Sequence, residues 1–85
     1  MKHLHIVRDP NERLAIEVAA RQSKEDAVSL LLIQDGVLAR PPLDRINCYA
    51  LSDDLEARQV SSPGGVIDYD GMARMIAEHD KVVVW

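Results

Sequence analysis

Four aspartates occupy similar positions along the chain and are the first candidates for chemistry. Each follows an expected strand and precedes an expected helix: Asp9, Asp35, Asp53 and Asp68. In a parallel sheet these positions lie at the carboxyl edge, where open α/β sheets bind ligands. Converging carboxylates are the oxygen ligands that Mg²⁺ prefers, so an acidic-edge, Mg²⁺-binding regulatory module is one interpretation. The other is that each aspartate caps the helix that follows it.

The stretch "SLLLIQDGV", residues 29–37, places one of these aspartates at the end of an aliphatic run. The run predicts a strand that is buried on both faces, with Gln34, Asp35 and Gly36 at the candidate mouth of the sheet edge. We expect Asp35 to cap a short helix that Gly36 begins, and Gln34 to help satisfy the backbone there. A nucleotide site is disfavoured, because the chain contains neither GxGxxG nor a P-loop motif.

Histidine and cysteine supply the remaining candidates. His3 and His5 alternate along the first expected strand and therefore point to one face, but two imidazoles without a third ligand are a weak metal signal. His79, near the end of the last helix, is placed to interact with the helix dipole. Cys48, the only cysteine, has no cationic neighbour in sequence. This favours a buried, inert thiol over the alternative of a persulfide carrier.

Composition limits the possible classes of protein. The 85 residues predict one domain, residues 1–85, and the 47% hydrophobic, 28% charged composition is that of a globular protein. A net charge of −4 argues against direct binding to nucleic acid. No apolar run has the length of a signal peptide or a membrane span, so we expect a cytoplasmic protein. A single cysteine excludes an internal disulfide.

Strands and helices alternate along the chain. Strands are expected at residues 3–8, 28–33, 45–51, 66–68 and 81–85, and helices at 9–24, 52–58 and 69–79, with a short helical segment within 34–40. Asp53 and Glu56 have the spacing of a capping box. This order predicts an α/β fold of three layers, α/β/α, around a mostly parallel sheet of four or five strands.

The motifs "LLLIQDGV", "YAL" with "DLEAR", "IDYDGM" and "HDKVVVW" occur in an order that resembles the TusB/DsrH family of sulfur-relay proteins. Leu4, His5, Val7 and Pro10 are similar too, so the resemblance covers nearly the whole chain. It implies the DsrE-like fold and assembly with DsrE/TusD-like and DsrF/TusC-like subunits. It also implies no cofactor, no metal and no catalytic residue of the chain's own, because the catalytic cysteine of such complexes belongs to another subunit.

The resemblance implies a role in passing persulfide sulfur between carrier proteins, towards 2-thiouridine at the tRNA wobble position. A subunit of a Dsr-type sulfur-oxidation complex is the alternative. Ala19 and Ala20 stand where DsrH-type members carry a cysteine, which favours the non-catalytic, TusB-like type. The segment "LARPPLDR", residues 38–45, is shorter than usual, and Gln59 replaces a glycine that suits a left-handed helix end. A homo-oligomer therefore remains an alternative assembly.

The C-terminal segment "HDKVVVW" is too apolar for an edge strand left in water, because exposed apolar edges pair with other chains. We expect Val83, Val84 and Trp85 to form a subunit interface, since tryptophan often anchors such contacts. The alternative is that the chain tucks this segment against its own last helix.

Overall fold

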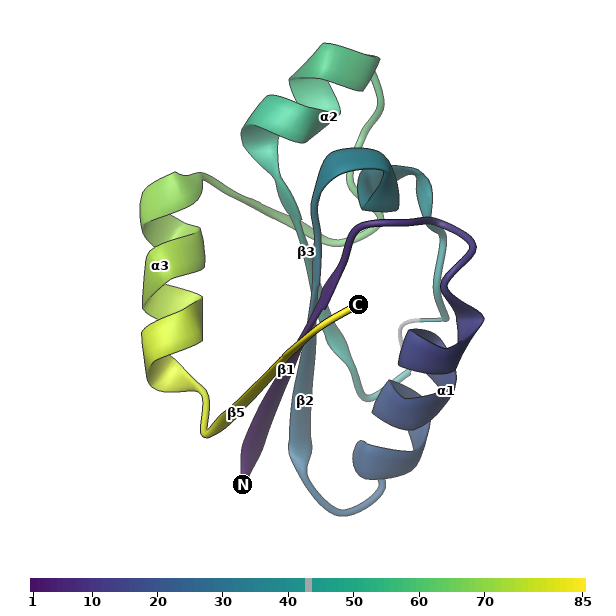
Figure 1. Ribbon diagram of the computed structural model, residues 1–85, viewed down its shortest axis with the longest axis vertical. Coiled ribbons are helices and arrows are strands. Elements are labelled where there is room, and N and C mark those ends of the chain that lie inside the picture. Colours follow the sequence, from purple (N-terminus) through teal and green to yellow (C-terminus); the bar gives the residue numbers. More distant parts are fainter. Residues whose placement is uncertain (43) are drawn as a thin grey trace.

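A computed structural model describes residues 1–42 and 44–85. Five strands form one sheet in the order β4-β3-β2-β1-β5, and every neighbouring pair is parallel (Figure 1). The strands are β1 (Lys2–Val7), β2 (Ala27–Leu32), β3 (Asn47–Leu51), β4 (Gly65–Ile67) and β5 (Lys81–Val84). The helices are α1 (Arg13–Gln22), η1 (Gln34–Leu38, a 3₁₀ helix), α2 (Ser52–Arg58) and α3 (Tyr69–Glu78).

Helices cover both faces of the sheet, which confirms the three-layer α/β/α prediction (Figure 1). The core on the α1 face includes Ala15 and Ala19 of α1 together with Leu55 of α2. α3 lies on the opposite face, where Met72 and Met75 pack over Leu4, Ile6 and Leu31. α3 also joins the two edges of the sheet, because it connects β4 to β5.

The centre of the sheet is the predicted aliphatic strand. Leu30, Leu31 and Leu32 of β2 are all 0% exposed, although successive side chains point to opposite faces. Complete burial of each leucine contributes about 1.5–3 kcal/mol relative to leaving it exposed. The strand therefore supplies apolar surface to both layers of core at once.

Two of the predicted N-caps, Asp9 and Asp53, are wrong. α1 begins at Arg13, because Asp9 opens a turn instead: its Oδ1 accepts from the Asn11 N–H at 2.9 Å. Such a local side-chain bond competes with the start of a helix. α2 begins at Ser52 with Leu51 as N-cap, so Asp53 lies inside the first turn and the predicted capping box is absent.

The start of α3 and the end of α2 agree with the predictions. Asp68 caps α3, and its Oδ1 accepts from the Gly71 N–H at 2.8 Å. Gln59 ends α2 in the left-handed conformation, with φ 52°, at the position where a glycine would be expected. The shortened segment 38–45 includes Leu43, which lies outside the described residues.

Gly36 lies where η1 packs against the end of β1, and there is no space there for a side chain. A Cβ built at Gly36 would lie 2.1 Å from the Val7 carbonyl oxygen, a backbone atom that cannot rotate away. The approach is fixed from the other side as well, since the Ile33 N–H donates to the same oxygen at 3.0 Å.

We expect Gly36→Ala to lower the free energy of unfolding by about 1–3 kcal/mol, the usual cost of overpacking, as measured by urea unfolding. Gly71→Ala is the matched control. A Cβ there comes no closer than 3.1 Å to the Ile67 side chain, and we expect a change below about 1 kcal/mol. Equal losses in the two variants would contradict the steric explanation.

Candidate functional site

The predicted mouth residues lie where β2 ends at the carboxyl edge of the sheet. Gln34 adopts a left-handed backbone conformation, with φ 51°, which is uncommon for a residue other than glycine. Its N–H donates to Asp54 Oδ2 of α2 at 2.7 Å. The carboxylate of Asp54 therefore stabilises the turn at Gln34, a role that the sequence analysis did not assign.

Asp35 does not cap η1, so that prediction is wrong. The 3₁₀ helix begins one residue earlier, at Gln34, and the Gly36 N–H is already satisfied by the Ile33 carbonyl at 2.8 Å. Asp35 instead accepts from Arg58 Nε at 2.9 Å. A cap is not needed where the backbone supplies its own acceptor.

Arg58 joins the two carboxylates of the mouth. Besides its bond to Asp35, its Nη1 lies 3.6 Å from Asp54 Oδ1 and donates to the Asp54 carbonyl at 3.3 Å. Asp54 and Arg58 are four residues apart on α2, a spacing that places them on one helix face. The only available sequence signal for this network was that spacing.

At the mouth, the carboxylates of Asp35 and Asp54 belong to a polar network with Arg58. In the described ranges, 1–42 and 44–85, no three His, Cys, Asp or Glu side chains come together as a possible metal site. The guanidinium of Arg58 balances Asp35 and Asp54, whereas Asp9 and Asp68 each bind a backbone N–H of their own turn.

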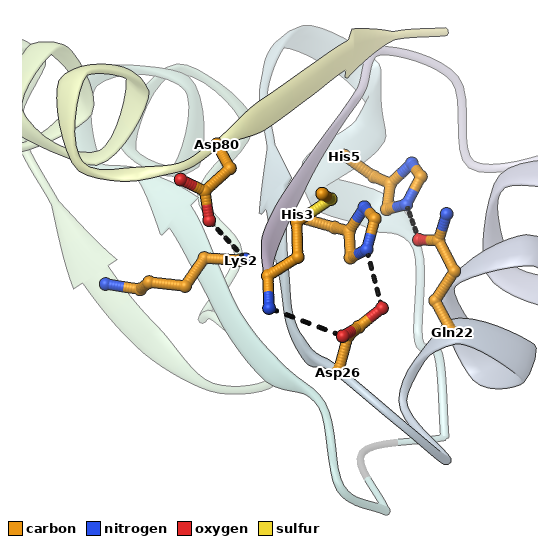
Figure 2. Close-up of polar contacts among 7 residues, drawn as sticks. Lys2, His3, His5, Gln22, Asp26 and Asp80 are labelled. Carbon is orange, nitrogen blue, oxygen red and sulfur yellow. Dashed lines mark hydrogen bonds and ion pairs between the residues drawn. The ribbon is translucent and has the colours of Figure 1, made fainter.

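His3 and His5 share the α1 face of β1 as predicted, and Figure 2 shows that each has its own partner. His3 Nε2 donates to Asp26 Oδ2 at 3.0 Å. This hydrogen bond is the main cause that lowers the pKa of Asp26, and the N-terminal ammonium group acts in the same direction. The pair anchors the start of β1 to the turn before β2.

The contacts of His5 determine its tautomer. Trp85 Nε1–H, which can only donate, lies 3.0 Å from His5 Nδ1, so Nδ1 must be the acceptor. The proton of the neutral ring is therefore on Nε2, which donates to Gln22 Oε1 at 2.7 Å. His5 is 1% exposed, and both of its ring nitrogens are satisfied. Protonation of Nδ1 would break the bond to Trp85.

Cys48 is buried in β3, as expected, with 6% of its surface exposed. Burial raises the pKa of the Cys48 thiol from 9.0 to about 11, and the charge of Arg40 opposes this shift only partly. With its pKa raised in this way, the thiol forms less thiolate near neutral pH than an exposed cysteine does. Thiolate is the nucleophilic form, so this environment suppresses sulfur chemistry.

β5 is an edge strand, as predicted, and its valines are open to solvent: Val82 is 37% exposed, Val83 41% and Val84 57%. Trp85 differs from them, because it is partly buried and packs on the core of the α1 face, opposite α3. Its carbonyl accepts from Arg8 Nε at 2.7 Å and its N–H donates to the Ile6 carbonyl at 2.9 Å. The interface role of Val83, Val84 and Trp85 stays a prediction.

The sequence of this chain matches a known protein family. A family model described as "DsrH like protein" matches residues 9–82, which is most of the chain. The chain belongs to the DsrH-like family. The family implies a subunit of a sulfur relay that works in complexes with other relay subunits. A comparison with curated proteins finds no match to this DsrH-like chain. No helix in the described residues has the length and apolar character needed to cross a bilayer.

For the DsrH-like chain we expect Asp54→Ala to lower the free energy of unfolding by about 1–3 kcal/mol, because the Gln34 N–H loses its acceptor and Arg58 loses a partner. Asp53→Ala is the control, since Asp53 is exposed and adds only its charge to the first turn of α2. Its loss should be below about 1 kcal/mol. Urea unfolding of both variants decides the matter, and a larger loss in Asp53→Ala would show that Asp54 has been assigned the wrong role.

Proposed function

We propose that the chain is a non-catalytic subunit, of the TusB-like type, in a cytoplasmic sulfurtransferase complex. The complex passes persulfide sulfur between carrier proteins, towards 2-thiouridine at the tRNA wobble position. The observation that supports the non-catalytic role is the environment of Cys48. It is the only cysteine of the chain, it is buried, and its pKa is raised to about 11.

The surroundings of Cys48 also oppose access by a carrier protein. The side chain lies in the core of the α1 face, in the cluster that contains Ala15, Ala19 and Leu30. Gly64 packs so closely that a Cβ there would lie 2.3 Å from the Cys48 carbonyl oxygen. A persulfide transfer requires the attacking thiolate to reach another sulfur atom in line, and Cys48, with 6% of its surface exposed, offers little access for that approach.

The exposed surface of β5 supports a role in assembly. An edge strand presents unpaired backbone groups, and here the side chains beside them are valines. The three hydrogen bonds of Trp85 hold the end of this strand in place before any partner binds. We propose DsrE/TusD-like and DsrF/TusC-like subunits as the partners, without direct contact with nucleic acid. Self-association of the chain is the alternative.

The non-catalytic role is tested by incubating the folded chain with a low-molecular-weight persulfide donor and measuring its intact mass. We expect no gain of a sulfur atom on the folded chain, and modification of Cys48 only after denaturation, because burial suppresses the thiolate. A rapid, stoichiometric gain of one sulfur that Cys48→Ser abolishes would instead make the chain a persulfide carrier.

The edge is tested by Val84→Lys in β5 against Val66→Lys in β4. The two valines are equally exposed, at 57%, and lie in the two opposite edge strands. After coexpression with the partner subunits, we expect Val84→Lys to reduce copurification at least about tenfold and Val66→Lys to leave it near the wild-type level, because a charge opposes burial. Size-exclusion chromatography of the chain alone reports self-association. Unchanged copurification by a folded Val84→Lys variant would rule out this edge.

A further inference from the structure

In the part of the chain that the structure describes, α3 is the helix that packs on one face of the sheet (Figure 1). Five strands at a spacing of about 4.8 Å make a sheet about 19 Å wide, whereas a helix with its side chains is about 10 Å across. None of the residues of α3 is buried, in contrast to α1, which buries Ala15 and Ala19. The α3 face is therefore incompletely covered. A cleft of about 350 Å³ lies between α3 and the amino-terminal halves of β1, β2 and β3.

The strands change character beneath this cleft. On the α3 face, Leu4, Ile6 and Leu31 are buried and apolar towards the carboxyl edge. Towards the amino edge the same face presents Ser29 and Asn47, which are register neighbours in β2 and β3. Ser29 is only 7% exposed, and its hydroxyl is held by His79 Nε2 at 3.3 Å. The floor of the cleft is thus polar at one end and apolar at the other.

Two cations line the polar end of the cleft, Lys2 from β1 and Arg74 from α3. Figure 2 shows the Lys2 side chain extending away from His3 and Asp26, and the Asp80 carboxylate bound to the Lys2 backbone N–H. Within residues 1–42 and 44–85, neither Lys2 nor Arg74 belongs to a salt bridge. The lining also contains one carboxylate, Glu78, and a second lies beside Lys2, since Asp80 Oδ2 accepts from the Lys2 backbone N–H at 2.8 Å. The cations that face the cleft are therefore the side chains of Lys2 and Arg74, in a chain whose net charge is −4.

His79 does not add to this charge in its neutral form. Its Nδ1 lies 2.6 Å from the Met75 carbonyl, which can only accept, so Nδ1 carries the proton. Nε2 is then the acceptor for the Ser29 hydroxyl. His79 and Ser29 therefore support the wall of the cleft, and its lining also holds other side-chain donors: Lys2, Arg74, the Asn47 amide and the Tyr49 hydroxyl.

We propose that this cleft binds a small organic anion, a phosphate or carboxylate attached to a compact apolar body. Lys2, Arg74 and Asn47 supply donors for the anionic group, and charge-assisted bonds of this kind are the stronger class of hydrogen bond. The side chains of Tyr49, Ile67 and Met75 form the apolar wall for the body of the ligand. This binding site is independent of the sulfur-relay role and does not involve Cys48.

The test is titration of the ¹⁵N-labelled full chain with phenyl phosphate, followed by heteronuclear NMR. We expect saturable shifts confined to the backbone amides that line the cleft, notably those of Asn47, Gly71 and Met75. Inorganic phosphate lacks the apolar body and phenol lacks the charge, so each should bind at least about tenfold more weakly than phenyl phosphate.

Arg74→Gln should weaken phenyl phosphate binding about tenfold, because it removes one charged donor. Arg21→Gln, a change of the same kind on α1 and on the other face of the sheet, is the control and should leave binding unchanged. Circular dichroism confirms that both variants fold. The proposal is overturned if phenyl phosphate causes no saturable shifts in the cleft, if phenol binds as tightly, or if the two arginine variants lose affinity equally. Binding that persists in Cys48→Ser separates this result from the test of the relay role.

Discussion

The hydrogen bonds of the buried imidazole of His5 hold three elements of this protein together. His5 lies in β1, the strand that pairs with both β2 and β5, and its two ring nitrogens bind Gln22 of α1 and Trp85 at the end of β5. A buried polar group without a partner costs about 1–3 kcal/mol, so the helix and the edge strand must both stay in place. The position of the exposed valines of β5 depends on this arrangement.

The polar side chains of the chain serve its own fold more than chemistry. Arg58 forms ion pairs with the two carboxylates at the mouth of the sheet, and Asp54 accepts a hydrogen bond from the turn at Gln34. Cys48, the one residue able to carry sulfur, is buried with its pKa raised to about 11. What remains available is surface: an edge strand with exposed valines and a cleft under α3. This distribution suits a subunit that positions other proteins.

The layers and the parallel sheet could be predicted from the sequence, because alternating strands and helices around the buried run at Leu30 to Leu32 leave few other packings. The aspartates could not be told apart by the same means. Asp68 is a cap, whereas Asp9 and Asp35 are not, because a cap depends on which backbone N–H groups already have acceptors. Two hydrogen bonds join residues far apart in sequence, Asp54 with Gln34 and His5 with Trp85. No local sequence pattern predicts such bonds.

The central claim is that the chain supports tRNA thiolation without carrying sulfur itself, and the most direct test is the 2-thiouridine content of total tRNA. The nucleoside is quantified by mass spectrometry in cells that lack the gene and in cells complemented with the wild-type chain or Cys48→Ser. The account predicts that deletion removes 2-thiouridine and that both chains restore it equally. A Cys48→Ser chain that is folded and present at the wild-type level but fails to restore 2-thiouridine would contradict the non-catalytic role. A deletion that leaves 2-thiouridine unchanged would contradict the role in tRNA thiolation.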